Sequence, residues 1–259
     1  MSLRSDPAQQ RSVVARVARL LDAISSSSVP LTLTEVASSS GLPLSTTHRL
    51  LSELVDTDLV ARLDKRFVLN LHMFEIGLQI PWLRTLRETA EPLMHNYALK
   101  TNQIVNLAIL RASDVVYIAK VAGPGAPRVP SHVGGRLPAH CTALGKLLLA
   151  HLDPHEADRR LSSDLVRMSP FSTITRQVLA GEFAQIRAEG VAYDREEVST
   201  GLACVAVPVR SEGRVVAAVS VAGPTHEVPK RTDIRGLQSL GRHIGASMAA
   251  SVNELLLDA

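Results

Sequence analysis

The chain has 259 residues, of which 46% are hydrophobic, 20% are charged and 3% are aromatic. This composition is that of a soluble globular protein with an aliphatic core, and the length allows one large domain or two. The sequence has no run of about 18 apolar residues, which excludes an ordinary transmembrane helix. The first residues, MSLRSDPAQQRS, lack the apolar core of a signal peptide, so we expect a cytoplasmic protein.

Net charge and cysteine content limit the partners and cofactors that can be expected. The net charge of +3 permits nucleic acid as a partner without requiring it. Cys141 and Cys204 fit neither a disulfide framework nor a metal site built from paired cysteines. We therefore expect reduced thiols, no metal and no cofactor.

Residues 1–70 read as a winged helix-turn-helix. Apolar residues at helical spacing predict a first helix over Val13, Val17, Leu20, Leu21 and Ile24. A second short helix is expected over 34–40, and a third near Ser45, which we expect to be its N-cap. The segment LVARLDKRFVL predicts two short strands joined by a tight turn at Asp64 and Lys65.

The third helix opens with hydrogen-bonding side chains, which are Ser45, Thr46, Thr47, His48 and Arg49. In a helix-turn-helix, the first residues of the second helix of the motif enter the major groove of DNA. The hairpin adds cations that could hold the flanking backbone, namely Arg62, Lys65 and Arg66. The alternative to DNA binding is an ordinary helix N-terminus whose polar face is solvated. Through Asn70, eight Lys and Arg oppose seven Asp and Glu, so binding depends on where the cations lie.

The remaining residues alternate strands and helices. Residues 71–90 predict a linker helix, and helical spacing continues to about Lys100 with interruptions at Pro81 and Pro92. IVNLAIL with VVYIAKV, and LACVAVPV with RVVAAVSVAG, predict two antiparallel hairpins. Between and after them, helices are expected from TALGKLLLAHL, from TRQVLAGEFAQIRAEG and over 232–257. Paired antiparallel strands separated by helices predict an α+β domain over residues 91–259.

The segment from Leu31 to Asn70, LTLTEVASSSGLPLSTTHRLLSELVDTDLVARLDKRFVLN, resembles the DNA-binding domain of the IclR (isocitrate lyase regulator) family of bacterial transcription factors. The resemblance continues through FEIG, VGGRLPAHCTALGKLLLA, YDREEVSTGLACVAVPV and AAVSVAGP, so it covers nearly the whole chain. It implies a winged helix-turn-helix, a linker helix used in dimerisation and a GAF-like effector-binding domain. Members repress or activate transcription at double-stranded operator DNA, usually as homodimers or tetramers.

The resemblance also implies a pocket for a small carboxylate effector. The matching residues are the amides of Ala143 and Leu144, the side chains of Asp194, Cys204 and Ser220, and an apolar wall of Val129, Leu137 and Leu202. Ala222 stands where small-acid sensors of the family have a serine, and Leu144 is bulkier than usual. We therefore expect an aromatic or longer-chain acid. Because two carboxylates repel, we expect Asp194 to accept a hydrogen bond from a ligand hydroxyl, a water or Ser220.

Two alternatives remain open. A redox-responsive DNA-binding regulator could use Cys141 and Cys204, and a cysteine-dependent enzyme could combine Cys204 with His140 and Asp194. Cys204 and Ser220 could also be purely structural. We predict a ligand-responsive DNA-binding regulator of a catabolic operon that is not an enzyme and contacts no membrane. Residues 72–83 are the predicted contact between protomers, with the apolar side chains of Phe74, Ile76, Leu78 and Ile80.

Overall fold

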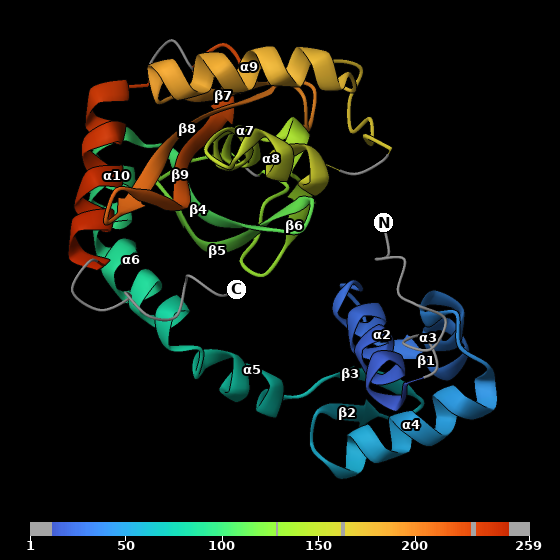
Figure 1. Cartoon of the computed structure of the whole chain (residues 1–259). Coiled ribbons are helices and arrows are strands. Elements are labelled where there is room, and N and C mark those ends of the chain that lie inside the picture. Colours follow the sequence, from blue (N-terminus) through green and yellow to red (C-terminus); the bar gives the residue numbers. More distant parts are fainter. Residues whose placement is uncertain (1–11, 128, 162–163, 229–231, 249–259) are drawn as a thin grey trace. The chain divides into compact units, whose positions relative to one another are not determined.

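The computed structural model describes residues 12–127, 129–161, 164–228 and 232–248. The chain divides between Ile80 and Pro81 into two compact units, each with its own buried apolar side chains (Figure 1). Within the described ranges, no helix is both long enough and apolar enough to cross a membrane.

The first unit has the predicted winged helix-turn-helix. Its elements are α2 (Val13–Ser25), β1 (Leu31–Thr32), α3 (Leu33–Ser40), α4 (Leu44–Asp56), β2 (Val60–Leu63), β3 (Arg66–Leu69) and α5 (Leu71–Leu78). The strands pair antiparallel in the order β1-β3-β2, and the short strand β1 is not predicted from the sequence. Leu20 of α2 meets Leu50 and Leu51 of α4 in the core, where all three side chains are fully buried.

The start of α4 differs from the prediction. The N-cap is Pro43 and no side chain caps the helix, so the expectation that Ser45 is the N-cap is wrong. The amide and the hydroxyl of Thr47 both donate to the Pro43 carbonyl, at 2.9 Å and 3.1 Å. The proline has no amide donor of its own and its restricted φ suits the entry into a helix, so the N-cap lies two residues earlier than expected.

Two prolines in the following helical region act differently. The helical structure is interrupted between α5 and α6 (Pro81–Thr101), just before Pro81, as predicted. Pro92 lies inside α6, and the prediction of a second interruption is wrong. A proline costs a helix nothing at its first position, whereas inside it the loss of a hydrogen bond must be offset elsewhere. Ala90 and Met94 of α6 are fully buried, and this packing offsets the loss.

The second unit is the predicted α+β domain. Six antiparallel strands form one sheet in the order β6-β5-β4-β9-β8-β7. Their bounds are β4 (Ile104–Arg111), β5 (Asp114–Ala122), β6 (Arg136–Pro138), β7 (Ala192–Arg195), β8 (Leu202–Ser211) and β9 (Arg214–Pro224). Both predicted hairpins are confirmed, as β4–β5 and β8–β9. The short strands β6 and β7 are additions to the sequence prediction.

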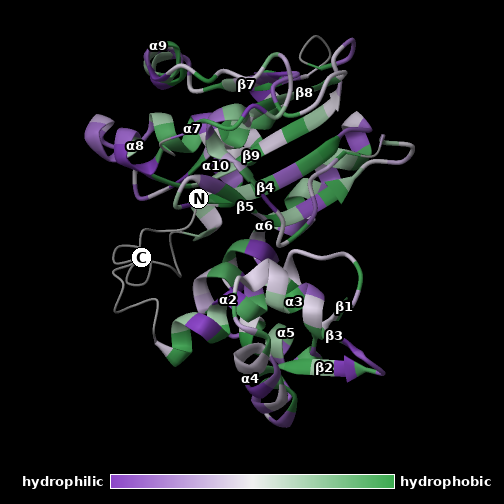
Figure 2. Cartoon of the chain, turned by 90° about the vertical axis from the view of Figure 1, so that its right-hand side faces the viewer, coloured by the Kyte–Doolittle hydropathy of each residue, from purple (hydrophilic) through white to green (hydrophobic). Residues whose placement is uncertain are grey.

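Helices cover the sheet on both faces. α6 and α10 (Ile234–Met248) share one apolar cluster with it, and the other cluster joins it to α7 (Ala143–Ala150), α8 (Pro154–Arg160) and α9 (Arg176–Glu189). Figure 2 shows many hydrophobic residues along the strands between these two layers. The predicted last helix begins at Ile234, and its expected end at Leu257 lies outside the described residues. A short 3-10 turn, η1 (Ala139–Cys141), leads into α7.

Candidate functional site

The first turn of α4 presents only part of the predicted DNA-contacting set. Ser45, His48 and Arg49 are exposed, and Thr46 is half-buried. Thr47 is fully buried and its hydroxyl donates to the Pro43 carbonyl. Because this hydroxyl is held inside the core of the unit, the structure disfavours a contact between the Thr47 side chain and DNA. Arg49 forms an ion pair with Glu53 one turn later, with both side chains 56% exposed, so it is free to exchange partners.

The hairpin places its cations beside this helix. Arg62 donates from Nε to the Asp64 carbonyl at 2.8 Å, and Arg66 donates to the Pro30 carbonyl at 2.8 Å. An open groove of about 370 Å³ runs between α4 and the hairpin, and its polar lining is His48, Ser52, Asp56, Arg62 and Lys65. Three predicted residues, His48, Arg62 and Lys65, thus line one groove. Ser52 and Asp56 line it too and were not predicted from the sequence.

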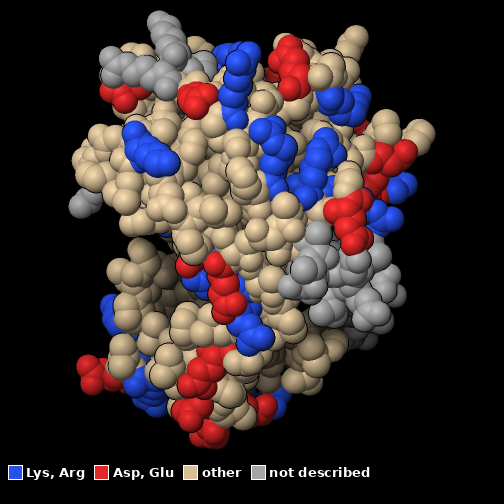
Figure 3. Space-filling model, turned by 90° about the vertical axis from the view of Figure 1, so that its left-hand side faces the viewer, with Lys and Arg blue, Asp and Glu red and all other residues tan. Residues whose placement is uncertain are grey.

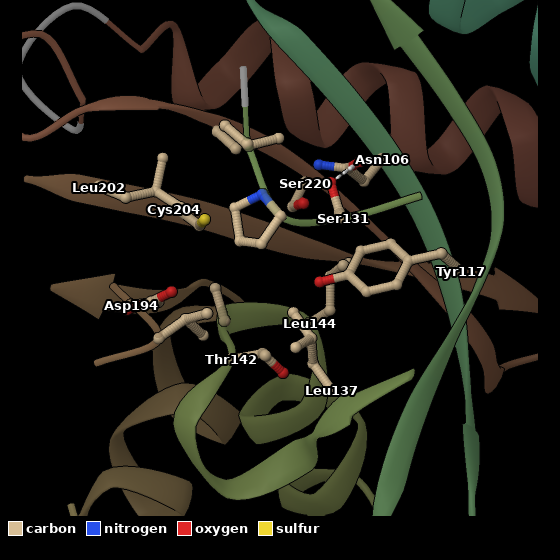
Figure 4. A pocket seen from close by; sticks show the side chains of 15 residues that line it. Asn106, Tyr117, Ser131, Leu137, Thr142, Leu144, Asp194, Leu202, Cys204 and Ser220 are labelled. Atoms are coloured by element: carbon tan, nitrogen blue, oxygen red, sulfur yellow. Dashed lines mark hydrogen bonds between the residues drawn. The ribbon is translucent and has the colours of Figure 1, made fainter. Parts of the chain in front are cut away.

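The second unit contains a pocket lined by all eight predicted effector-site residues. They are Val129, Leu137, Ala143, Leu144, Asp194, Leu202, Cys204 and Ser220 (Figure 4). The pocket also includes Asn106, Tyr117, Pro130, Ser131, Thr142, Val198 and Ala222. The only signal in the sequence for Asn106 is its lone polar side chain within the apolar run IVNLAIL. Nothing in the local sequence marks Ser131, which comes from the connection between β5 and β6.

Strand register brings the polar groups of the pocket together. Asp194 pairs with Cys204, and Cys204 pairs with Ala222, which forms one row across β7, β8 and β9. Ser220, two residues before Ala222, pairs with Asn106 on β4. Residues opposite one another in antiparallel strands, and residues two apart along a strand, share a face. The side chains therefore project to the face of the sheet that α7 covers.

Helix α7 closes the pocket with its N-terminus. Thr142 is the N-cap, and its hydroxyl accepts a hydrogen bond from the Gly145 amide at 3.0 Å. The amides of Ala143 and Leu144 belong to the first turn, where a helix has no carbonyl partner of its own to offer. A Cβ at Gly145 would lie 2.3 Å from the backbone of Ala139, so only glycine lets α7 start this close to η1. The arrangement suits an anion.

Asp194 has an unusual protonation state for an aspartate. Its side chain is 2% exposed, and burial raises its pKa to about 7, although the Glu197 amide donates to Oδ1 at 2.7 Å. Near neutrality the group therefore carries a proton for much of the time. A protonated carboxyl can donate a hydrogen bond to a ligand carboxylate. The expected repulsion between Asp194 and an acidic ligand is removed by this shift.

Both cysteines are poor nucleophiles. Burial raises the pKa of Cys141 to about 12 and the pKa of Cys204 well above its usual value, and Asp194 adds to both shifts. Reactive thiols need a lowered pKa. Burial also lowers the pKa of His140, whose Nε2 lies 2.9 Å from the Val166 carbonyl oxygen. This environment disfavours the cysteine-dependent enzyme and the redox regulator.

A buried ion cluster supports the turn after Asp194. Lys146 of α7 is 1% exposed, and its Nζ lies 2.5 Å from Glu197 Oε1 and 2.7 Å from Glu182 Oε2. Ser172 Oγ donates to the Glu197 carbonyl at 2.6 Å. The cluster joins α7 and α9 to the turn that carries Asp194. Across the described part of the chain, no group of three or more His, Cys, Asp or Glu side chains is arranged to hold a metal.

Known protein families match both units of the chain. The family model "IclR helix-turn-helix domain" matches residues 13–64, and "Bacterial transcriptional regulator IclR C-terminal" matches residues 83–246. The chain is 33% identical to the HTH-type transcriptional regulator XynR of Escherichia coli, over 83% of this chain and 87% of that protein. It is 31% identical to the E. coli transcriptional repressor IclR, over 83% of this chain and 81% of that protein.

Two solved structures of regulators are similar to this chain over most of its length. An IclR homologue from Microbacterium hydrocarbonoxydans, complexed with 4-hydroxybenzoate, superposes with a TM-score of 0.84 at 28% identity, covering 93% of this chain and all of that one. A putative transcriptional regulator from Rhodococcus sp. RHA1 gives a TM-score of 0.76 at 28% identity, covering 92% of this chain and 98% of that one. The curated relatives named above are regulators and not enzymes. The chain belongs to the IclR family of transcriptional regulators, with a DNA-binding helix-turn-helix and a ligand-binding C-terminal domain.

Proposed function

We propose that the chain regulates a catabolic operon in response to an aromatic or longer-chain carboxylic acid. The observation that carries this proposal is one pocket that combines the N-terminus of α7 with Ser220 and with Asp194, whose pKa is raised to about 7. A helix N-terminus favours a carboxylate through its free amides and dipole. The 4-hydroxybenzoate complex of a structural relative supports an aromatic acid as the effector class.

The polar groups divide into two sets that match the two ends of such a ligand. The carboxylate would accept from the amides of Ala143 and Leu144, from Ser220 and from the Asp194 carboxyl. The Asn106 amide and the Tyr117 hydroxyl are then left for a ligand hydroxyl or carbonyl. Ala222 and Leu144 supply apolar wall where a sensor of two- or three-carbon acids has polar or smaller groups. This favours an aromatic ring over glyoxylate or pyruvate.

The free volume of the pocket is small, about 20 Å³. That volume holds about one water, so an aromatic acid must displace part of the wall. Two hydrogen bonds hold the wall segment that contains Ser131. Ser131 Oγ donates to Asn106 Oδ1 at 3.0 Å, and Lys120 Nζ donates to the Ser131 carbonyl at 2.5 Å. Effector binding would exchange the first of these bonds for bonds to the ligand.

The first unit would bind double-stranded operator DNA through Ser45, Thr46, His48 and Arg49 of α4, with Arg62, Lys65 and Arg66 on the flanking phosphates. Arginine can read guanine through two parallel hydrogen bonds. One recognition helix reads only a few base pairs, so useful specificity needs two half-sites and a symmetric dimer or tetramer. Helix α5 would join the protomers, because none of its residues is buried and Phe74, Ile76, Leu78 and Ile80 are exposed.

The test is a binding screen on the full chain. Benzoate, 4-hydroxybenzoate, pyruvate, glyoxylate and the cation benzylamine would each be titrated by calorimetry, with thermal unfolding as a second readout. We expect the aromatic acids to bind and raise the unfolding temperature, and benzylamine to do neither. Binding of benzylamine alone, or equal binding of the acids to Ser220→Ala and Asp194→Ala variants, would place the effector elsewhere.

A further inference from the structure

A second cavity of the C-terminal unit shares no residue with the effector pocket. It is an open groove of about 270 Å³ between the end of α9, strand β8 and helix α10. Its lining is Gly190, Pro208, Arg210, Gln238 and Arg242. No carboxylate is among these residues, and three of the five residues, Arg210, Gln238 and Arg242, carry side-chain hydrogen-bond donors. The two guanidinium groups and the amide are the polar groups of the lining, and they suit an anion.

Close packing fixes the backbone positions of the two exposed arginines beside the groove. A Cβ at Gly241 would lie 2.6 Å from the Pro208 carbonyl oxygen, and one at Gly245 would lie 2.0 Å from the Arg210 carbonyl oxygen. Only glycine at both positions lets α10 approach β8 this closely. Arg242 follows Gly241 directly, so its Cα is held at the same contact. Gln238 lies one turn earlier on α10 and faces the same side.

The two guanidinium groups have no acidic partner within the described residues. Arg210 donates from Nη1 to the Gly213 carbonyl at 3.3 Å, and Arg242 forms no ion pair. Figure 3 shows Lys and Arg side chains gathered on the face of the C-terminal unit that includes this region. Arg210 also acts on a half-buried neighbour, because the pKa of His151 is lowered by burial first and then by the charges of Arg210 and Arg187. Among the described residues, no acidic side chain is paired with either guanidinium group.

We propose that this groove binds a small, multiply charged oxyanion, either inorganic phosphate or the phosphate group of a metabolite, independently of the effector pocket. Guanidinium groups bind phosphate oxygens through paired, charge-assisted hydrogen bonds. The two guanidinium groups together match the charge of a phosphate dianion, and the Gln238 amide supplies a further hydrogen-bond donor. Because the arginines are already held in place, binding requires little rearrangement of the backbone.

The test uses the full chain in phosphate-free buffer at constant ionic strength. Inorganic phosphate would be titrated by calorimetry and by broadening of its ³¹P resonance, on wild type and on the Arg242→Gln and Arg210→Gln variants. Arg235→Gln is the matched control: Arg235 is exposed on the same helix, does not line the groove and loses the same charge. We expect saturable binding to wild type and to the control, and a loss of about tenfold or more in each groove variant.

Two further variants separate the proposal from a structural role for the arginines. Gln238→Glu keeps both arginines and places a carboxylate in the groove, so it should abolish phosphate binding in a folded protein. Ser220→Ala should leave phosphate binding unchanged. Phenyl phosphate, run beside inorganic phosphate, distinguishes a metabolite-borne phosphate from the free ion. The proposal is wrong if phosphate does not bind wild type, if Arg235→Gln loses as much as Arg242→Gln, or if the groove variants lose only thermal stability.

Discussion

The backbone amide of Glu197 donates a 2.7 Å hydrogen bond to Asp194 Oδ1, while the side chain of the same glutamate is paired with the buried Lys146. One residue thus joins the pocket carboxyl to an ion cluster beneath it. Asp194 is held with one oxygen engaged, and its other oxygen remains for Cys204 or a ligand. The protonation of Asp194 and the integrity of the cluster are the two properties that can be tested first.

Stability should depend on pH through Asp194. Its pKa is raised from 3.8 in the unfolded chain to about 7 in the folded one, so the folded state binds more protons than the unfolded state between these values. The contribution is therefore fully present below about pH 4 and is lost as pH rises through about 7. We expect urea unfolding of wild type, compared with Asp194→Asn, to show this relative loss between pH 5 and about 8. A pH-independent difference between the two proteins would contradict the raised pKa.

Effector affinity should depend on Ser220. Removing its hydroxyl from a bound carboxylate should cost about 1–2 kcal/mol, because the lost bond is charge-assisted. Calorimetry with 4-hydroxybenzoate on Ser220→Ala measures this, and DNA affinity without ligand should barely change. Ser247→Ala, an exposed serine of α10, is the control and should bind as wild type does. Unchanged affinity in both variants would remove Ser220 from the site.

Breaking the buried ion cluster should destabilise the second unit strongly. Lys146→Met leaves Glu197 buried without its cation. Removing one partner of a buried ion pair lowers the free energy of unfolding by about 3–5 kcal/mol. Arg159→Met provides a matched comparison, since Arg159 pairs with Glu156 at the surface and its side chain is 71% exposed. We expect that variant to lose less than about 1 kcal/mol. Equal losses in chemical unfolding would mean that the cluster contributes no more than a surface pair.

Operator binding should depend on Arg49. If its guanidinium reads a base, Arg49→Ala should lose about 1–3 kcal/mol of affinity for an operator selected from random DNA. If it contacts phosphate, the loss should be similar on all sequences and the salt dependence should fall. Gel-shift titrations at two salt concentrations decide between these outcomes. Arg111→Ala, at the end of β4 in the other unit, should bind the operator like wild type. Unchanged operator affinity of Arg49→Ala would show that the assignment is wrong.

Assembly should depend on the exposed face of α5. Phe74 is 59% exposed and Ile76 is 49% exposed in the single chain, which is costly for large apolar side chains in water. Phe74→Glu should therefore shift sedimentation from an oligomer toward monomer and weaken operator binding. Glu75→Gln, on the same helix, should do neither. A wild-type monomer with full operator affinity would refute the predicted contact.

Local sequence determined most of the first unit and the order of elements in the second. Helical spacing of apolar residues placed α2 and α4, and alternating apolar runs placed the hairpins β4–β5 and β8–β9, because these patterns report which face of an element is buried. Proline was predicted less well: Pro81 begins a helix, whereas Pro92 lies inside one, because packing against the sheet decides whether a lost hydrogen bond is tolerated. The strand β6 has only three residues, too few for a periodic signal.

The sites depended on tertiary structure to different degrees. Family motifs named the eight predicted residues that share the pocket, but Ser131 joins it only because its loop folds over β4 and bonds Asn106. Thr47 looks like its neighbours in the sequence, and only the direction of its side chain shows that it is buried. The raised pKa of Asp194 is likewise invisible in the sequence. Burial and hydrogen-bond partners are set by residues distant along the chain, and they alone decide whether a carboxyl is charged.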